Sequence, residues 1–309
     1  MPDSYDIRLI APGGYPHNPG LMRTGIERIE AAGHRVHGQD VLDRQYLRFA
    51  GTDADRAADL NALADPAVPL PDVALAIRGG YGAHAVLPLL DYDGLRARLG
   101  DAPLALVGHS DFTALQCALL ARSGVATLGG PLLADFGAPE RDPLTWEHFW
   151  QVLGSAQASA SWDAPDTADL AVEGTIWGGN LAMLSSLVGS SYFPEVDGGI
   201  FYVEDIAEPP YRVERMLYHL LHAGVLGRQK ALLLGDFTGC RVAEYDNGYD
   251  LSVAFERIGA AAGIPLVRGL PFGHAPAKFT LPFGVAGRLD VAAGRATLAF
   301  SGHPRPKTP

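Results

Sequence analysis

Leu104-Ala-Leu-Val-Gly-His-Ser-Asp-Phe-Thr-Ala-Leu-Gln116 is the stretch of this sequence that says most about the fold. A short apolar run ends at Val107, a glycine follows, and a helical pattern begins just after Ser110 and Asp111. A strand that turns sharply into a helix lifts the serine hydroxyl clear of the sheet and places N–H groups of the first helical turn beside it. We therefore predict a cofactor-free serine hydrolase with Ser110 as nucleophile. The alternative is an ordinary N-cap serine.

The same order of strand and helix recurs through the first half of the chain. Each apolar run is short and is closed by a nearby glycine or proline, as is typical of buried strands. The alternation predicts parallel βαβ units in a doubly wound α/β sheet, whose ligands bind beyond the carboxyl ends of the strands. The expected strands are 7–11, 73–77 and 104–107, and the expected helices are 20–32, 53–64 and 112–123.

A change of composition divides the chain. Residues 154–170 are mostly small and polar and show no sustained period, which predicts a linker between two domains at 1–155 and 165–305. The second domain mixes short strands with fewer helices and is expected to be of mixed β/α type. Its expected strands are 200–203, 231–234, 285–290 and 296–300, and its expected helix is 210–223.

Charge and composition exclude several classes of partner. The formal net charge is −11 and no run of Lys or Arg offsets it, so we expect no nucleic acid partner. No apolar stretch reaches the ~18 residues of a membrane span, and the N-terminal residues lack the regions of a secretory signal, so we expect no association with a membrane.

Two cysteines, Cys117 and Cys240, fit a reducing compartment and thus a cytoplasmic protein. No spacing of His, Asp or Glu suits a metal, so none is predicted.

A nucleophilic serine needs a base, and His274 is the best candidate among ten histidines. It lies in a loop rich in Gly and Pro, residues 270–284, and such rigid loops often hold catalytic groups in place. His84 could also line the cleft, whereas His109 adjoins the serine on a turn that should direct its side chain elsewhere. For every one of these histidines a structural role is the alternative.

The base in turn needs a carboxylate. Glu204, Asp205 and Glu208 follow the apolar run that ends at Val203, and Glu204, nearest the strand, is the candidate acid. For Asp205 a turn cap and for Glu208 a solvated position are favoured instead.

Two glycine-rich stretches complete the candidate site. Arg78-Gly-Gly-Tyr-Gly82 ends a predicted strand, and the N–H of Gly80 is a candidate oxyanion donor, with a plain tight turn as the alternative. Trp177-Gly-Gly-Asn180 is expected either to wall the cleft or to cap a helix.

These residues resemble the LD-carboxypeptidase family of serine peptidases. The matching segments run in family order over nearly the whole chain, and Ala11-Pro-Gly-Gly-Tyr15 departs from it because many relatives carry a serine after the proline. Phe112, where a glycine would complete a Gly-x-Ser-x-Gly elbow, makes an α/β-hydrolase the weaker choice. The segments are Arg78-Gly-Gly-Tyr-Gly82, Gly108-His-Ser-Asp-Phe-Thr113, Gly178-Gly-Asn-Leu181, Val203-Glu-Asp205, Glu208-Pro-Pro-Tyr-Arg-Val-Glu-Arg-Met-Leu217, Gly273-His274 and Pro282-Phe-Gly284.

The resemblance implies a fold and a site. The fold is a flavodoxin-like parallel-sheet N-terminal domain, which carries the nucleophile, and a smaller mixed β/α C-terminal domain, which carries the acid and the base. Members are commonly homodimers. The implied catalytic triad is Ser110, Glu204 and His274, the implied oxyanion donors are the N–H groups of Gly80 and Asp111, and the candidate substrate-binding residues are Arg78, Tyr81, Trp177 and Asn180.

The resemblance also implies a substrate. The family peptidase hydrolyses the amide between the L-centre of meso-diaminopimelate and terminal D-alanine in murein tetrapeptides, during cytoplasmic cell-wall recycling. Arg78 is a candidate partner for the substrate carboxylate, with a structural ion pair as its alternative. The rival functions are a related immunity peptidase that cleaves acyl-sulfamoyl adenylate antibiotics, an ordinary esterase or amidase, and a non-catalytic binding module.

Overall fold

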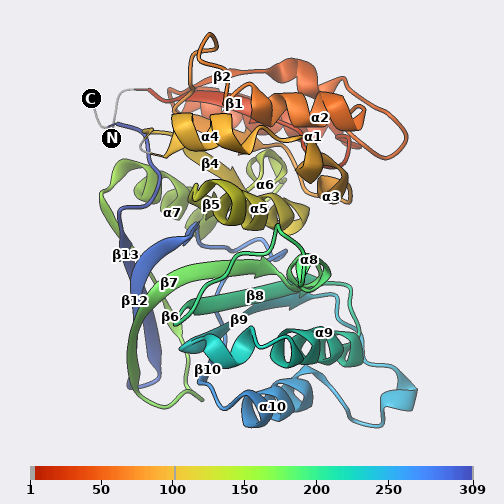
Figure 1. Cartoon of the computed structure of the whole chain (residues 1–309), viewed down its shortest axis with the longest axis vertical. Helices are drawn as coiled ribbons and strands as arrows, with labels where there is room; N and C mark the ends of the chain where they lie inside the picture. The colour runs from red at the N-terminus through yellow and green to blue at the C-terminus, as the bar shows by residue number, and fades with distance from the viewer. Residues whose placement is uncertain (1–3, 101, 308–309) are drawn as a thin grey trace.

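The computed structural model describes residues 4–100 and 102–307, so the first three residues of the N-terminal region considered above lie outside it. Figure 1 shows two sheets stacked along the long axis, the N-terminal sheet with its helices above and the second sheet below. In the part of the chain that is described, no helix has both the length and the apolar character that a bilayer crossing requires.

The first sheet has the strand order β11-β5-β4-β3-β1-β2. Its five N-terminal strands are parallel and follow the flavodoxin-like order 2-1-3-4-5, so their carboxyl ends share one edge. They are β1 (Asp6–Ile10), β2 (Arg35–His37), β3 (Val73–Ala76), β4 (Ala105–Gly108) and β5 (Thr127–Gly129). The sixth strand, β11 (Leu281–Phe283), comes from the C-terminal half and pairs antiparallel with β5.

Local sequence signals account for the helices around this sheet. Asn18 caps the first helix, with proline at the next position, and Thr52 forms a capping box with Asp55 at the second. The helix after β4 is buried along most of its length, so its pattern is apolar on nearly every side. The helices are α1 (Pro19–Ala31), α2 (Asp53–Asn61), α3 (Ala83–Val86), α4 (Tyr92–Leu99), α5 (Thr113–Ser123), α6 (Leu133–Gly137) and α7 (Pro143–Gly154).

The second sheet is mixed and has the order β10-β9-β8-β7-β12-β13-β6. Its parallel part is β7 (Leu170–Asn180), β8 (Ile200–Ile206), β9 (Ala231–Thr238) and β10 (Leu266–Val267), accompanied by α8 (Leu181–Leu187), α9 (Pro210–His222) and α10 (Leu251–Ala262). Its antiparallel part is β12 (Val285–Ala292), β13 (Arg295–Ser301) and β6 (Gln157–Asp163).

The expectation of an irregular linker at 154–170 is wrong for its central part. β6 occupies Gln157–Asp163 and pairs antiparallel with β13. Ala158, Ala160 and Trp162 are buried and alternate with more exposed residues, a strand period that small side chains had concealed. The edge strand of the second sheet therefore lies within the predicted linker.

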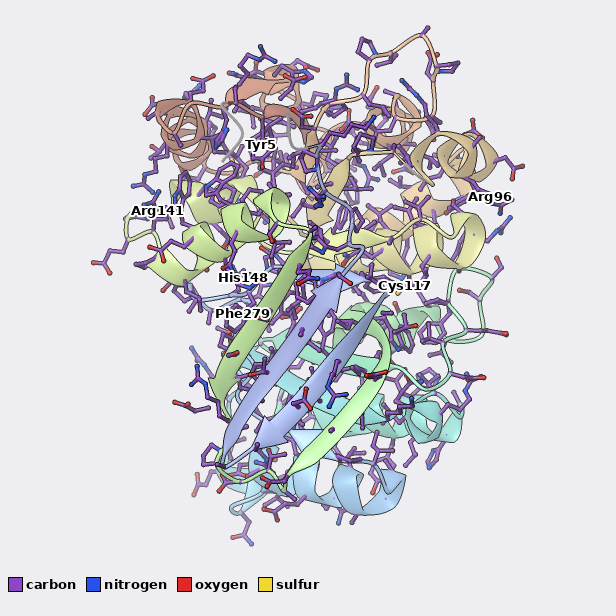
Figure 2. All side chains as sticks on the ribbon, turned by 90° about the vertical axis from the view of Figure 1, so that its left-hand side faces the viewer. Tyr5, Arg96, Cys117, Arg141, His148 and Phe279 are labelled. Carbon is purple, nitrogen blue, oxygen red and sulfur yellow. The ribbon has the colours of Figure 1, made fainter. Side chains whose placement is uncertain are left out.

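The loop between β10 and β11 joins the two sheets. Lys278 N donates to Thr145 Oγ1 over 2.8 Å, and Thr145 Oγ1 donates to Pro276 O over 2.7 Å. His148 lies against Phe279 with ring centroids 4.7 Å apart, and both residues are labelled where the two sheets meet in Figure 2. The loop is thus fastened to α7 of the N-terminal half before it enters β11.

Candidate active site

Ser110 lies just past the carboxyl end of β4, at the first position of a 3₁₀ turn, Ser110–Phe112, that leads into α5. Its φ is +64°, a left-handed conformation that few non-glycine residues adopt. A Cβ on Gly79 would stand 2.9 Å from Ser110 Oγ, so only glycine fits beside the hydroxyl. The turn is therefore a strained strand-to-helix corner with the serine at its apex, which a simple N-cap does not require.

His274 and Glu204 lie in line with this serine. His274 Nε2 is 2.9 Å from Ser110 Oγ, and His274 Nδ1 is 2.7 Å from Glu204 Oε2. The three residues come from the turn after β4, the strand β8 and the loop before β11. The structure thus brings together the three residues that the sequence singled out, in the geometry that a nucleophile, a base and an acid require.

Glu204 is completely buried, and its second oxygen is also satisfied. Asn180, its neighbour on β7, donates from Nδ2 to Glu204 Oε1 over 3.1 Å. The same amide lies 3.2 Å from Asp205 Oδ1, and Asn180 Oδ1 accepts from Met183 N at the start of α8. The predicted substrate contact of Asn180 is not seen in this arrangement: the residue is 5% exposed, and its amide N–H groups donate to Glu204 and Asp205. Its role here is to hold Glu204 in the direction of His274.

Asp205 and Glu208 have structural partners. Asp205 accepts from Ala182 N and Ile206 N, which agrees with the turn cap favoured for it. Burial raises the pKa of Asp205 to about 6, and the neighbouring Glu204 charge adds to the effect. Glu208 pairs with Arg212 at 2.7 Å instead of standing free in solvent.

The charge of Glu204 sets the protonation of His274. Burial by itself lowers the pKa of His274, but the hydrogen bond and the negative charge of Glu204 outweigh it, and the net pKa lies above the ordinary value of 6.5. His109 stacks edge-on against His274 at 5.1 Å, and burial lowers the pKa of His109 to about 3. His109 is therefore neutral, and His274 is the histidine suited to receive a proton.

The two candidate oxyanion donors lie on facing loops. Asp111 follows Ser110, and its N atom is 3.4 Å from the position of a Cβ on Gly79. Gly80, at φ +87°, continues the loop after β3. The Asp111 carboxylate accepts from Ala83 N over 2.8 Å and so ties this loop to the serine turn. The arrangement gives both N–H groups a fixed backbone near Ser110.

The remaining predicted residues separate into two groups. Arg78 and Tyr81 line a cavity of about 300 Å³ next to Gly80. Trp177 does not wall a cleft: it is fully buried and its Nε1 donates to Gln229 Oε1 over 3.0 Å, so its predicted contact with substrate is wrong. β7 continues through Trp177 to Asn180, and the tryptophan therefore faces the core. His84 lies 2.8 Å from Ser186 Oγ.

Sequence reasoning missed several residues that shape the site. Gly80 and not Gly79 is predicted from the sequence, although two consecutive glycines indicate that both positions approach other atoms closely. Lys278, a lysine within an apolar loop, is 1% exposed and lies 2.5 Å from Asp135 of α6. Only an acidic partner explains such a lysine, but no pattern in the sequence names the partner. Among the described residues no cluster of three or more His, Cys, Asp or Glu could hold a metal ion.

Comparison with known proteins gives matches over nearly the whole chain. The model of the LD-carboxypeptidase N-terminal domain matches residues 7–130, and that of the C-terminal domain matches residues 173–289. A putative carboxypeptidase of Streptomyces coelicolor is 37% identical over 94% of this chain and 92% of its own length. The murein tetrapeptide carboxypeptidase of Pseudomonas aeruginosa is 30% identical over 92% of each chain.

Solved structures agree with these matches. The muramoyltetrapeptide carboxypeptidase from Oxalobacter formigenes superposes with a TM-score of 0.88 at 38% identity, over 96% of this chain and 99% of that one. The microcin C7 self-immunity protein of Escherichia coli is 26% identical over 86% of this chain and 84% of its own length. A structure of that immunity protein has a TM-score of 0.82 at 23% identity over 99% of this chain and 97% of that one, which shows a shared fold.

Proposed function

This chain belongs to the LD-carboxypeptidase family of serine peptidases, and from that premise we propose that it removes terminal D-alanine from murein tetrapeptides. The bond cleaved is the amide to the L-centre of meso-diaminopimelate. The observation that carries the proposal is the contact chain of 2.9 Å from Ser110 to His274 and 2.7 Å from His274 to Glu204. Relatives named as murein tetrapeptide carboxypeptidases support the choice of substrate.

The first half of the mechanism is acylation. His274 Nε2 accepts the hydroxyl proton as Ser110 Oγ attacks the substrate carbonyl, and Glu204 accepts a hydrogen bond from His274 Nδ1–H throughout. Glu204 thereby fixes the tautomer and stabilises the imidazolium. The N–H groups of Gly80 and Asp111 donate to the oxyanion of the tetrahedral intermediate, and each such donor is worth about 10²–10³-fold in rate.

The second half releases the products. His274 returns the proton to the amine of D-alanine as the C–N bond breaks, which leaves the shortened peptide as an ester on Ser110. His274 then takes a proton from water, the hydroxide oxygen attacks the ester carbonyl, and the proton passes back to Ser110 Oγ as the peptide acid departs. The family resemblance and two free cysteines, Cys117 and Cys240, lead us to place this reaction in cytoplasmic cell-wall recycling, by a homodimer.

We also propose that the two halves of the chain supply different catalytic residues. We assign Ser110 to a domain at 1–155 and Glu204 and His274 to a domain at 165–305. β6 lies between these limits and pairs with β13, so it extends the second sheet.

A product assay tests the function. We expect release of one D-alanine from a tetrapeptide that ends in diaminopimelate–D-alanine, together with covalent labelling of Ser110 by a fluorophosphonate, detected by mass spectrometry. The Ser110→Ala variant is the matched control and should give neither signal. Labelling without D-alanine release would leave a serine hydrolase of another specificity, and the absence of both would leave a binding module.

The immunity peptidase remains the second candidate because the fold matches a structure solved with aspartyl sulfamoyl adenosine. Incubation of this chain with that compound and with the tetrapeptide separates the two functions. Cleavage of the sulfamoyl compound alone would replace the proposed activity with the second one.

A further inference from the structure

A cavity of about 300 Å³ opens beside the proposed oxyanion loop. Its walls come from three loops, after β1, before α2 and after β3, so it lies beyond the carboxyl edge of the first sheet, where ligands bind in such folds. The lining residues are Gly14, Tyr15, His17, Arg48, Arg78, Gly80 and Tyr81.

Two of these residues are arginines that form no ion pair with a described residue, although Arg48 is close enough to the Asp111 carboxyl group to lower its pKa. Among residues 4–100 and 102–307, neither Arg48 nor Arg78 has a carboxylate within 4.0 Å, although the chain carries 35 acidic residues. Arg78 Nη1 donates to Tyr15 O over 2.8 Å, which leaves its other N–H groups free for a ligand. Burial lowers the pKa of Arg78, and the Arg48 charge lowers it further, so an anion in the cavity would relieve both effects.

The cavity walls are held by a buried arginine of α2. Arg56 is completely buried and donates from Nη1 to Pro12 O over 2.9 Å and to Gly82 O over 2.7 Å. Its guanidinium also lies 4.7 Å from the centroid of the Phe49 ring, which comes from the third loop. One side chain therefore fixes all three loops, and the two free arginines are presented by a rigid frame.

The frame connects the arginines to the loop that lies against Ser110. Gly14 N donates to Gly79 O over 3.0 Å, and Gly79 lies against Ser110. A Cβ on Gly80 would stand 3.6 Å from Arg78 Nη2, so the guanidinium adjoins the loop that carries the proposed oxyanion donor. The guanidinium of Arg48 lies 5.6 Å from the ring centroid of Tyr81, which is 57% exposed at the rim. The cavity and the proposed nucleophile thus lie on either side of the same loop, Gly79–Gly80.

We propose that Arg48 and Arg78 together bind the free α-carboxylate of the residue that is released, and so restrict the enzyme to the last peptide bond. The proposal rests on the peptidase function given above. A guanidinium offers paired N–H donors that match the two oxygens of a carboxylate, and the Tyr81 ring lies against the guanidinium of Arg48 at the rim. An internal peptide bond has no carboxylate at this place and would leave both charges unpaired.

The test compares two substrates that differ only at this group. One is the tetrapeptide with terminal D-alanine, and the other is the same peptide with terminal D-alaninamide. We expect the wild-type kcat/KM to be about 100-fold higher for the acid, because a hydrogen-bonded charge pair is lost with the amide. Arg78→Gln and Arg48→Gln should each reduce this ratio at least 10-fold. Arg78→Lys should reduce it less, since lysine keeps the positive charge but lacks the paired N–H donors of a guanidinium.

Arg35→Gln is the matched control. Arg35 lies at the opposite end of the strands, is 75% exposed in its side chain and should leave the ratio unchanged. Fluorophosphonate labelling of Ser110 in each variant shows whether the site is still assembled. Equal wild-type turnover of acid and amide, or a ratio that neither arginine variant alters, would overturn the proposal while leaving the peptidase intact. Failure of the wild type to hydrolyse either peptide would overturn the function and this inference together.

Discussion

Lys278 Nζ lies 2.5 Å from Asp135 Oδ1 and so joins the loop of the proposed base to α6 of the first half of the chain. The lysine is 1% exposed, and it stands four residues after His274. Because this ion pair fastens the loop that carries His274 to α6, the alignment of His274 with Ser110 depends on how the two halves of the chain pack.

Loss of one member of this pair should destabilise the protein. Lys278→Met leaves the Asp135 carboxylate without its partner, and we expect the free energy of unfolding to fall by about 3 kcal/mol. Lys278→Met/Asp135→Asn removes both charges and should recover most of that loss. Because Lys278 also lowers the pKa of His274, Lys278→Met should move the acidic limb of kcat/KM to higher pH, and the double variant should move it less because two opposite charges are removed together. Urea unfolding and a pH–rate profile measure the two effects, and an unchanged profile would show that the pair is structural only.

Removal of the nucleophile or the base should nearly abolish turnover. We expect Ser110→Ala and His274→Ala each to lower kcat by about 10⁴-fold or more, because the steps they perform have no substitute in the site. The double variant should be no worse than either single one, since the two residues act as a unit. D-alanine release measures all three, and turnover within 10-fold of wild type in either single variant would remove that residue from the mechanism.

Neutralising the acid should shift the pH dependence in a defined direction. His274 must be neutral to accept a proton, so activity rises with pH through its pKa, which Glu204 raises. Glu204→Gln should move this rise to lower pH and reduce kcat by about 10²–10⁴-fold, because an amide can favour the wrong imidazole tautomer. Glu256→Gln, at an exposed position on α10, is the control and should change neither. A rise displaced to higher pH would contradict the assignment.

A single methyl group at Gly79 should disable the serine. The Cβ of alanine would stand 2.8 Å from Ser110 Cβ and 2.9 Å from its Oγ, so the serine must move. A displacement of this kind costs about 100-fold in rate, and we expect kcat/KM of Gly79→Ala to fall at least that far. Gly227→Ala is the matched control, because apart from its chain neighbours no atom of the described residues lies within 4 Å of its Cβ position. The prediction fails if both variants hydrolyse the tetrapeptide equally well.

The buried carboxyl group of Asp111 should make stability depend on pH. Burial raises its pKa to about 6, so the folded protein binds the proton more tightly than the unfolded chain, and stability falls as pH rises from about 4 to 6. We expect Asp111→Asn to increase the free energy of unfolding by about 2 kcal/mol at pH 8 and to change it little at pH 4. Asp93→Asn, whose side chain is 93% exposed, is the control. Urea unfolding at the two pH values measures the difference from wild type. A lower free energy of unfolding for Asp111→Asn at pH 8 would refute the prediction.

The sequence by itself determined the doubly wound arrangement of the first half, because its signals are local. Apolar runs, caps such as Asn18 and the glycines after β3 and β4 act over a few residues, and each predicted strand of the first half is present within about a residue of its expected limits. Local signals of the same kind also indicated that Ser110 and Glu204 lie at the ends of strands and that His274 lies in a loop rich in Gly and Pro.

Tertiary structure alone decided how those residues meet. Ser110 and His274 are 164 positions apart, and their 2.9 Å contact exists because β11 returns to the first sheet and Lys278 is fixed to Asp135. The predictions of a cleft position for Trp177 and of a linker over β6 are wrong for the same reason: whether a side chain faces a core or a cleft depends on the strand across the sheet. Contacts between distant segments cost chain entropy that only the complete packed core repays, so no local pattern can specify them.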